Sequence, residues 1–315
     1  MTTEQRMRHG TDPVRTTGEQ VAETLRAAGI RHAFTVPGES FLGVLEALDD
    51  AGIQVVAARH EGGAGFMAEA YGQLTGQPAA LLVTRAVGVA NASIAIHTAY
   101  ADSTPMIVLA GQVPTTTSGR EAFQEADLVR TFGALGKWAA EPRQADEVAA
   151  AVRTAVYEAC DGRPGPTLVT LPEDLLDQPA AGPPPSDPRR RTAEEPDPGD
   201  VTAALALLTR ARRPVIVAGA GVLRAGATAE LTEFAEAVGV TVISSWRRGD
   251  VMDNEHPLYL GMTGYWAATT VKRRLLAADA LLVLGCRLNE PTTFGYQYPR
   301  SDQRWIHVDL EPGVE

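Results

Sequence analysis

Apolar residues are spaced along this chain in two alternating ways, at helical intervals and in short continuous runs. Val21, Leu25 and Ala28 mark one face of a helix, and residues 32–36 follow it as a strand. Four further runs predict strands that are buried on both faces: residues 54–58, 79–84, 106–110 and 167–171. Helical patterns fill most of the intervals, so the sequence predicts an α/β fold with a doubly wound parallel sheet.

A proline-rich segment interrupts this alternation. Seven of the 22 residues from Pro179 to Asp200 are proline, and they are interleaved with arginines and glutamates, a composition that does not form a packed core. The predicted organisation is a flexible N-terminal tail (residues 1–17), a first domain (18–178), a linker (179–200) and a second domain (201–315).

The alternation resumes after the linker. Apolar runs predict strands at residues 214–218, 240–244, 280–285 and 305–310, with a helix near 229–238. The sequence ends soon after the last run, before the helix that usually covers such a strand. We therefore expect a second, incomplete Rossmann-like α/β domain, whose uncovered last strand favours aggregation.

Charge and composition narrow the choice of partners. The chain carries 28 Lys and Arg against 39 Asp and Glu, a net charge of −11, which argues against nucleic acid and anionic membranes as partners. Cys160 and Cys286 are far apart and form no CxxC pair, so neither a disulfide scaffold nor a cysteine-based metal site is expected. With no apolar leader at the start and no apolar run of membrane-spanning length, a cytoplasmic protein is expected.

Glu61 is the first candidate for chemistry. It follows the predicted strand at residues 54–58 and opens a glycine-rich helix, at the edge where parallel α/β sheets bind ligands. His60 and Glu61 do not form a zinc-binding HExxH motif, because Ala64 stands where the second histidine would be. An acid at a helix N-terminus is also favoured by the helix dipole, so the local sequence leaves both roles open.

A glycine loop after the strand at 214–218 suggests a second hypothesis, a nicotinamide-dependent dehydrogenase. Gly219 and Gly221 give a GxG pair, but the next glycine lies at the wrong spacing for GxGxxG. No acid follows the next strand to bind a ribose, although Arg247 and Arg248 could meet a 2′-phosphate. The sequence therefore disfavours this hypothesis.

An ordered series of motifs gives Glu61 a more specific context. The series contains Val36-Pro37-Gly38, Arg59-His60-Glu61, Thr84 with Gly88 and Asn91, Gly111-Gln112, Phe123-Gln124-Glu125 and Gly162-Arg163-Pro164-Gly165-Pro166. It closely resembles the pyrimidine-binding domain of thiamine diphosphate enzymes, in the acetolactate synthase-like branch. The segment after the linker is similar to the start of the central domain in the same family.

The resemblance implies that the chain binds thiamine diphosphate and that Glu61 is catalytic. In the family the matching glutamate, kept protonated by an apolar pocket, hydrogen-bonds the aminopyrimidine ring and favours the tautomer that activates the cofactor. Other cofactor-binding positions match Pro37, Gly38, Thr84, Gly88 and Asn91. Phe123 and Gln124 match residues of the substrate channel; without the resemblance they would be a core phenylalanine and a surface glutamine. Some members bind FAD, and Arg163, Gly261 and Gly264 match positions that contact it.

The resemblance also implies a partner and a substrate class. Family members continue into a domain whose GDG motif holds Mg²⁺ and the diphosphate, and this sequence contains no GDG. Mg²⁺ is therefore expected to bind through a domain that is not in this chain. The expected partner is a homo-oligomer or a partner subunit that supplies this domain. The alternative is that the chain is an inactive fragment. The substrate would be a 2-keto acid, decarboxylated with or without carboligation. Glu173 and Pro291 replace two cations of acetolactate synthases, and an acid at 173 is expected to repel the substrate carboxylate.

Overall fold

A computed structural model describes residues 15–180 and 195–311. The chain divides into two compact units, one within Met1–Arg191 and the other within Thr192–Glu315. Most of the predicted tail and most of the predicted linker lie outside the described residues. Within the described part, Thr16 forms an antiparallel bridge with Pro179, so the two ends of the first unit lie side by side.

The first unit is built on a six-stranded parallel sheet. The strand order is β2-β1-β3-β4-β6-β5, with every pairing parallel. The strands are β1 (His32–Thr35), β2 (Gln54–Ala57), β3 (Ala79–Thr84), β4 (Met106–Gln112), β5 (Trp138–Ala140) and β6 (Pro166–Pro172). The helices are α1 (Thr17–Ala27), η2 (Glu39–Phe41), α2 (Leu42–Asp50), α3 (Glu61–Thr75), α4 (Arg85–Asp102), α5 (Leu128–Phe132), η3 (Gly133–Leu135), α6 (Ala145–Cys160) and α7 (Glu173–Leu176).

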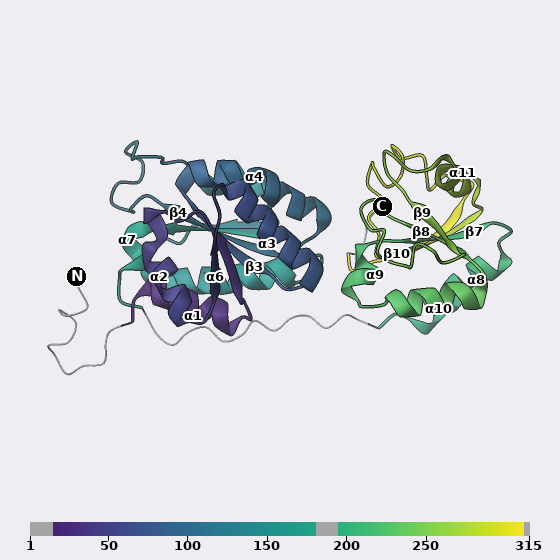
Figure 1. Ribbon diagram of the computed structural model, residues 1–315, viewed down its shortest axis with the longest axis horizontal. Coiled ribbons are helices and arrows are strands. Elements are labelled where there is room, and N and C mark those ends of the chain that lie inside the picture. The colour runs from purple at the N-terminus through teal and green to yellow at the C-terminus, as the bar shows by residue number, and fades with distance from the viewer. Residues whose placement is uncertain (1–14, 181–194, 312–315) are drawn as a thin grey trace. The chain divides into compact units, whose positions relative to one another are not determined.

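Helices cover both faces of this sheet, as the doubly wound prediction requires (Figure 1). Buried residues of α1, α2 and α6 pack on one face and those of α3 and α4 on the other. Strands β4 and β6 are buried along their whole length. The prediction of a strand buried on both faces is wrong for β2, because it forms the edge of the sheet and its four residues are exposed or half-buried.

The second unit contains a five-stranded parallel sheet in the order β11-β10-β7-β8-β9. Counted along the chain this is the 3-2-1-4-5 order of Rossmann folds, which agrees with the Rossmann-like prediction. The strands are β7 (Pro214–Ala218), β8 (Thr241–Ser244), β9 (Tyr259–Met262), β10 (Ala280–Leu284) and β11 (Arg304–Val308). The helices are α8 (Pro198–Arg210), α9 (Ala220–Arg224), α10 (Thr228–Val238) and α11 (Thr269–Ala277).

Three local features differ from the sequence prediction. Helix α8 begins inside the predicted linker, because Asp197 caps it and Pro198 occupies its first turn. Strands β5 and β9 are not anticipated, since the first is only three residues long and the second contains Gly261. The last predicted strand, at residues 305–310, is present as β11 at the edge of the sheet, and its Trp305 and Val308 are exposed.

Candidate functional site

Strand order brings most of the predicted site residues to one edge of the first sheet. In a parallel sheet all strands end at the same edge, and ligands bind there where the strand order reverses. Here the chain runs outward from β1 to β2 and then returns to β3 on the other side of β1. Pro37 and Gly38 follow β1, Glu61 follows β2 and Thr84 ends β3. The sheet therefore places these four residues around its point of reversal.

Close packing of α3 against α4 joins Glu61 to Asn91. A Cβ atom on Gly65 would lie 2.6 Å from the Cβ of Ala95, and one on Gly62 would lie 3.1 Å from the carbonyl oxygen of Asn91. The two glycines thus allow the helices to approach more closely than side chains would permit. As a result the Nδ2 of Asn91 donates a hydrogen bond to the Oε2 of Glu61 at 2.9 Å.

Glu61 stands at the first position of α3. His60 caps the helix, because its Nδ1 accepts a hydrogen bond from the N–H of Gly62 at 3.0 Å. The dipole of α3 favours an anion here. Glu61 is half-buried and Asn91 is exposed, so the described residues leave one side of this pair open to water. The water-poor pocket that the resemblance implies would need a further surface to cover the pair.

Gly38 and Thr84 meet where β1 and β3 end. A Cβ on Gly38 would lie only 1.7 Å from the Oγ1 of Thr84, so any larger residue here would displace the Thr84 side chain. The hydroxyls of Thr84 and Ser40 are buried and have no hydrogen-bond partner among the described residues. Buried hydroxyls normally have such a partner, so these two hydroxyls could each form a hydrogen bond with a ligand beside Glu61.

Gly88 contributes to packing at this edge. It is buried in α4, where a Cβ would come within 3.1 Å of the side chain of Val83 in β3. Because Gly88 has no side chain, the first turn of α4 can pack closely against the sheet. Gly88 therefore supports the position of Asn91, one turn further along the same helix.

The loop between β4 and α5 carries Phe123 and Gln124 at the same edge. Phe123 is 72% exposed, which rules out the alternative of a core phenylalanine. Gln124 has a φ of 62° and lines a hollow of about 490 Å³ over the loop. Glu125 holds the loop in shape, accepting hydrogen bonds from the N–H groups of Gly119 at 2.5 Å and Ala122 at 3.0 Å. These hydrogen bonds lower the pKa of Glu125.

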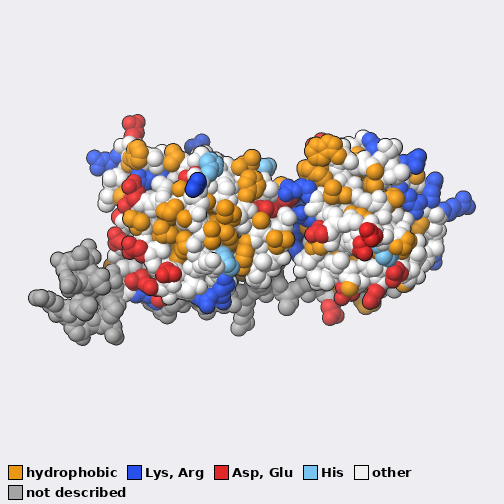
Figure 2. Space-filling view, viewed as in Figure 1, with side chains coloured by type: hydrophobic (Ala, Val, Ile, Leu, Met, Phe, Trp, Pro, Cys, Tyr) orange, Lys and Arg blue, Asp and Glu red, His pale blue; other side chains and the backbone are white. Residues whose placement is uncertain are grey.

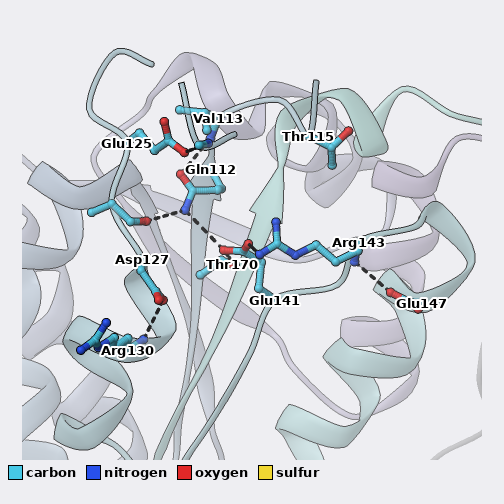
Figure 3. A network of polar contacts seen from close by, with 12 residues as sticks. Gln112, Val113, Thr115, Glu125, Asp127, Arg130, Glu141, Arg143, Glu147 and Thr170 are labelled. Atoms are coloured by element: carbon cyan, nitrogen blue, oxygen red, sulfur yellow. Dashed lines mark hydrogen bonds and ion pairs between the residues drawn. The ribbon is translucent and has the colours of Figure 1, made fainter. Parts of the chain in front are cut away.

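A polar network anchors the other end of this loop to the sheet (Figure 3). The Nε2 of buried Gln112 donates to the carbonyl oxygen of Ala126 at 2.9 Å and to the Oε2 of Glu141 at 3.4 Å. Glu141 also accepts from the hydroxyl of Thr170 at 2.7 Å and pairs with Arg143 at 2.9 Å. Because β4 and β6 supply Gln112 and Thr170, the loop is held by the carboxyl ends of two central strands.

Glu173 lies at this edge but is already paired. Its Oε2 lies 3.0 Å from the Nη2 of Arg85, the first residue of α4. The expected repulsion between Glu173 and a substrate carboxylate therefore needs correction, because Arg85 compensates the negative charge. Sequence analysis missed Arg85; the signal for it was an arginine placed directly after a buried apolar strand.

The three residues matched to FAD do not gather in one described unit. Arg163 lies in the loop before β6, at the amino edge of the first sheet, opposite Glu61. It donates hydrogen bonds to the Oγ of Ser103 and the carbonyl of Tyr100, both at 2.8 Å, and its guanidinium lies 5.1 Å from the Tyr100 ring centre. Gly261 and Gly264 belong to the second unit, where both have positive φ.

The glycine loop of the second unit is occupied by neighbouring backbone. A Cβ on Gly219 would lie 2.3 Å from the carbonyl oxygen of Gly285, and one on Gly221 would lie 2.5 Å from its Cα. These glycines therefore let the ends of β7 and β10 pack together. Helix α9, which follows them, has only five residues. This geometry accounts for the glycines without a dinucleotide.

The described residues contain neither a cluster of metal ligands nor a membrane-spanning helix. Within residues 15–180 and 195–311, no three His, Cys, Asp or Glu side chains gather closely enough to hold a metal ion. None of the helices in those same ranges combines the length and apolar character needed to cross a membrane.

Comparison with known proteins shows the family to which the two units are similar. Residues 15–131 match the family model of the thiamine pyrophosphate enzyme N-terminal TPP binding domain, and residues 201–314 match that of the central domain. A probable acetolactate synthase large subunit of Methanocaldococcus jannaschii is 32% identical over 300 residues, covering 93% of this chain and 51% of the relative.

Two bacterial relatives show the same coverage. The acetolactate synthase isozyme 3 large subunit of Escherichia coli K12 is 32% identical over 93% of this chain and 52% of its own length. The acetolactate synthase large subunit of Corynebacterium glutamicum is 31% identical over 95% of this chain and 49% of its own length. The chain thus spans about half the length of the curated relatives it matches.

Proposed function

Because the chain belongs to the thiamine pyrophosphate enzyme family, in the acetolactate synthase-like branch, we propose that its first unit binds the aminopyrimidine ring of thiamine diphosphate. The observation that carries this proposal is the hydrogen bond between Asn91 and Glu61 at the reversal point of the sheet. We propose the activity of the branch, decarboxylation of a 2-keto acid with or without transfer of the remaining carbon fragment to an acceptor.

The residues at the carboxyl edge fit the ring chemically. A pyrimidine nitrogen can accept a hydrogen bond from a protonated carboxyl, and Glu61 supplies that group. Its Oε2 accepts a hydrogen bond from Asn91, and we propose that Oε1 is the oxygen that meets the ring. The unpaired hydroxyl of Thr84 supplies a further polar contact beside Gly38. When bound, thiamine diphosphate supplies an electron sink for the carbanion left after loss of CO₂.

Glu61 would act by holding one proton at Oε1 and sharing it with the ring. Asn91 fixes the plane of the carboxyl group, so that the proton stays directed at the ring nitrogen. The dipole of α3 favours an anion at this position, so the proposed role requires a covering surface whose exclusion of water outweighs the dipole. The chain's own residues thus orient the ring and place a proton beside it.

An exposed apolar surface on α3 and α4 supports a covering partner. Figure 2 shows hydrophobic side chains gathered over these helices. The surface consists of Phe66, Met67 and Leu74 on α3 and Val87 and Ile94 on α4. Asn91 falls at helical spacing between Val87 and Ile94, so a partner that covered this surface would also cover the Glu61–Asn91 pair. We propose that the partner is a second copy of the protein or a subunit carrying the diphosphate domain.

Mg²⁺ and FAD are the two other cofactors that the family resemblance implies. Mg²⁺ and the diphosphate would be held by the diphosphate domain, because the described residues offer no cluster of metal ligands. FAD binding at Arg163, Gly261 and Gly264 stays a prediction, and the contacts of Arg163 with Ser103 and Tyr100 already explain that arginine.

Turnover by a reconstituted enzyme tests the proposed function. The chain would be mixed with the remaining half of the Methanocaldococcus relative, thiamine diphosphate, Mg²⁺ and pyruvate as the probe 2-keto acid, and CO₂ release would be followed. We expect release with the wild-type chain and with Glu46→Gln, an exposed carboxylate of α2, and at least about a hundredfold less with Glu61→Gln. Equal release with Glu61→Gln would refute the proposed role of Glu61.

A further inference from the structure

Arg85 connects three segments at the carboxyl edge of the first sheet. Its Nη1 donates a hydrogen bond to the carbonyl oxygen of Phe123 at 3.0 Å, and its Nη2 lies 3.0 Å from the Oε2 of Glu173. The Oε1 of Glu39 lies 3.9 Å from the same Nη2. These partners come from the β4–α5 loop, from α7 and from η2, so one guanidinium joins segments that are far apart in the sequence.

The position of Arg85 is unfavourable for stability in three ways. Its side chain is only 9% exposed, although burying a charge costs desolvation energy. Its Nε is buried without a hydrogen-bond acceptor among the described residues. Its φ is 45°, in the left-handed region that residues other than glycine rarely adopt. Backbone outliers of this kind concentrate at functional sites.

The direction of the guanidinium indicates what it does. Its hydrogen bond is to the backbone carbonyl of Phe123, so it fixes the main chain at that residue. Phe123 and Gln124 are adjacent, and Gln124 lines the hollow over the loop. Arg85 also follows Thr84 directly, and Thr84 contacts Gly38. Arg85 thus ties the loop to the same edge that carries Glu61.

We propose that Arg85 is a positioning residue, which holds the Phe123–Gln124 pair at a fixed place relative to the Glu61 edge, with Glu173 as its counter-ion. The pairing neutralises Glu173, so the edge can admit an anionic substrate such as a 2-keto acid. We call this link between Arg85 and the Phe123–Gln124 pair the tether. The tether itself rests on the contacts of Arg85, and its consequence for the reaction rests on the proposed function.

Hydrogen exchange of the chain alone tests the tether. The loop amides of Gly119, Ala122 and Glu125 are protected by hydrogen bonds within the loop, so their exchange reports whether it keeps its shape. We expect exchange about tenfold faster or more in Arg85→Met, and an intermediate rate in Arg85→Lys, which keeps the charge. Arg26→Met, the same change at an exposed residue of α1, serves as the control and should exchange at the wild-type rate. Wild-type exchange in Arg85→Met would overturn the tether.

A double variant separates positioning from simple stabilisation. Arg85 is buried and Glu173 is 40% exposed, and replacing such a pair by neutral side chains of similar size is often neutral for stability, so Arg85→Met/Glu173→Gln should melt near the wild-type temperature. The proposal predicts that its loop amides still exchange fast and that its KM for pyruvate in the reconstituted enzyme rises about fivefold or more, while kcat changes less. Slow exchange in the stable double variant, or fast exchange with unchanged KM and kcat, would overturn the positioning role. Absence of turnover in the wild type would instead refute the proposed function, and the exchange result would still decide the tether.

Discussion

Replacing Gly65 by alanine should push α3 and α4 apart at the point that brings Asn91 to Glu61. The new Cβ would lie 2.6 Å from the Cβ of Ala95. Carbon atoms in contact prefer about 3.5–4.0 Å, so the helices would have to separate by roughly 1 Å. Overpacking of this kind typically costs about 1–3 kcal/mol, and alanine in place of helical glycine returns about 0.5–1 kcal/mol. The expected net loss of unfolding free energy is therefore between about 0 and 2.5 kcal/mol, with a middle value of about 1 kcal/mol.

Gly63 provides a matched control on the same helix. A Cβ there meets nothing within 4 Å, so Gly63→Ala should stabilise α3 by about 0.5–1 kcal/mol. The reciprocal swap Gly65→Ala/Ala95→Gly returns the missing space and keeps the number of methyl groups, so its stability should approach that of the wild type.

Urea-dependent hydrogen exchange of the α3 and α4 peptides would measure these effects in the first unit alone. The reasoning would be refuted if Gly65→Ala were as stable as Gly63→Ala, or if Ala95→Gly failed to rescue it. In the reconstituted enzyme, Gly65→Ala should also weaken thiamine diphosphate binding, because the Asn91–Glu61 hydrogen bond would lengthen.

Three further predictions concern other parts of the chain. Asn91→Leu removes the donor to Glu61 and should weaken thiamine diphosphate binding about tenfold by calorimetry in the reconstituted enzyme; unchanged affinity would contradict the role of Asn91. Burial raises the pKa of the Cys286 thiol from 9.0 to about 12, so its contribution to stability is complete below about pH 9 and is lost as the pH rises toward 12. The urea concentration at the unfolding midpoint should therefore fall between pH 9 and 12, and it should fall less steeply in Cys286→Ala than in the wild type. The same pH dependence in both proteins would count against this explanation. Trp305→Lys, on exposed edge strand β11, should reduce light scattering of concentrated chain, and unchanged scattering would show that this edge does not drive association.

The sequence predicts the position of candidate site residues where strand order alone determines it. The carboxyl ends of neighbouring parallel strands meet at one edge, so a glutamate after one strand and a Pro-Gly turn after another had to lie near the same crevice. The family resemblance added Asn91, and the structure places its side chain on Glu61. The catalytic role of Glu61 stays a prediction.

Features that depend on long-range pairing could not be predicted. The apolar pattern of residues 54–58 does not reveal that β2 is an edge strand, because this depends on the order in which strands pair. The pairing of Arg85 with Glu173 joins residues 88 positions apart, and neither carries a local signal for the other. The expectation that Glu173 repels a carboxylate considered that residue alone and missed its counter-ion.

The central claim is that the Glu61 edge of the first unit contacts the aminopyrimidine ring, and saturation-transfer NMR tests it most directly. Thiamine diphosphate would be added with Mg²⁺ to the chain mixed with the complementing half, and transfer from protein to the ring protons would be measured. We expect strong transfer to the pyrimidine protons with the wild-type chain and with Glu46→Gln, and a marked loss with Glu61→Gln. Equal transfer with Glu61→Gln, or none with the wild type, would contradict the claim.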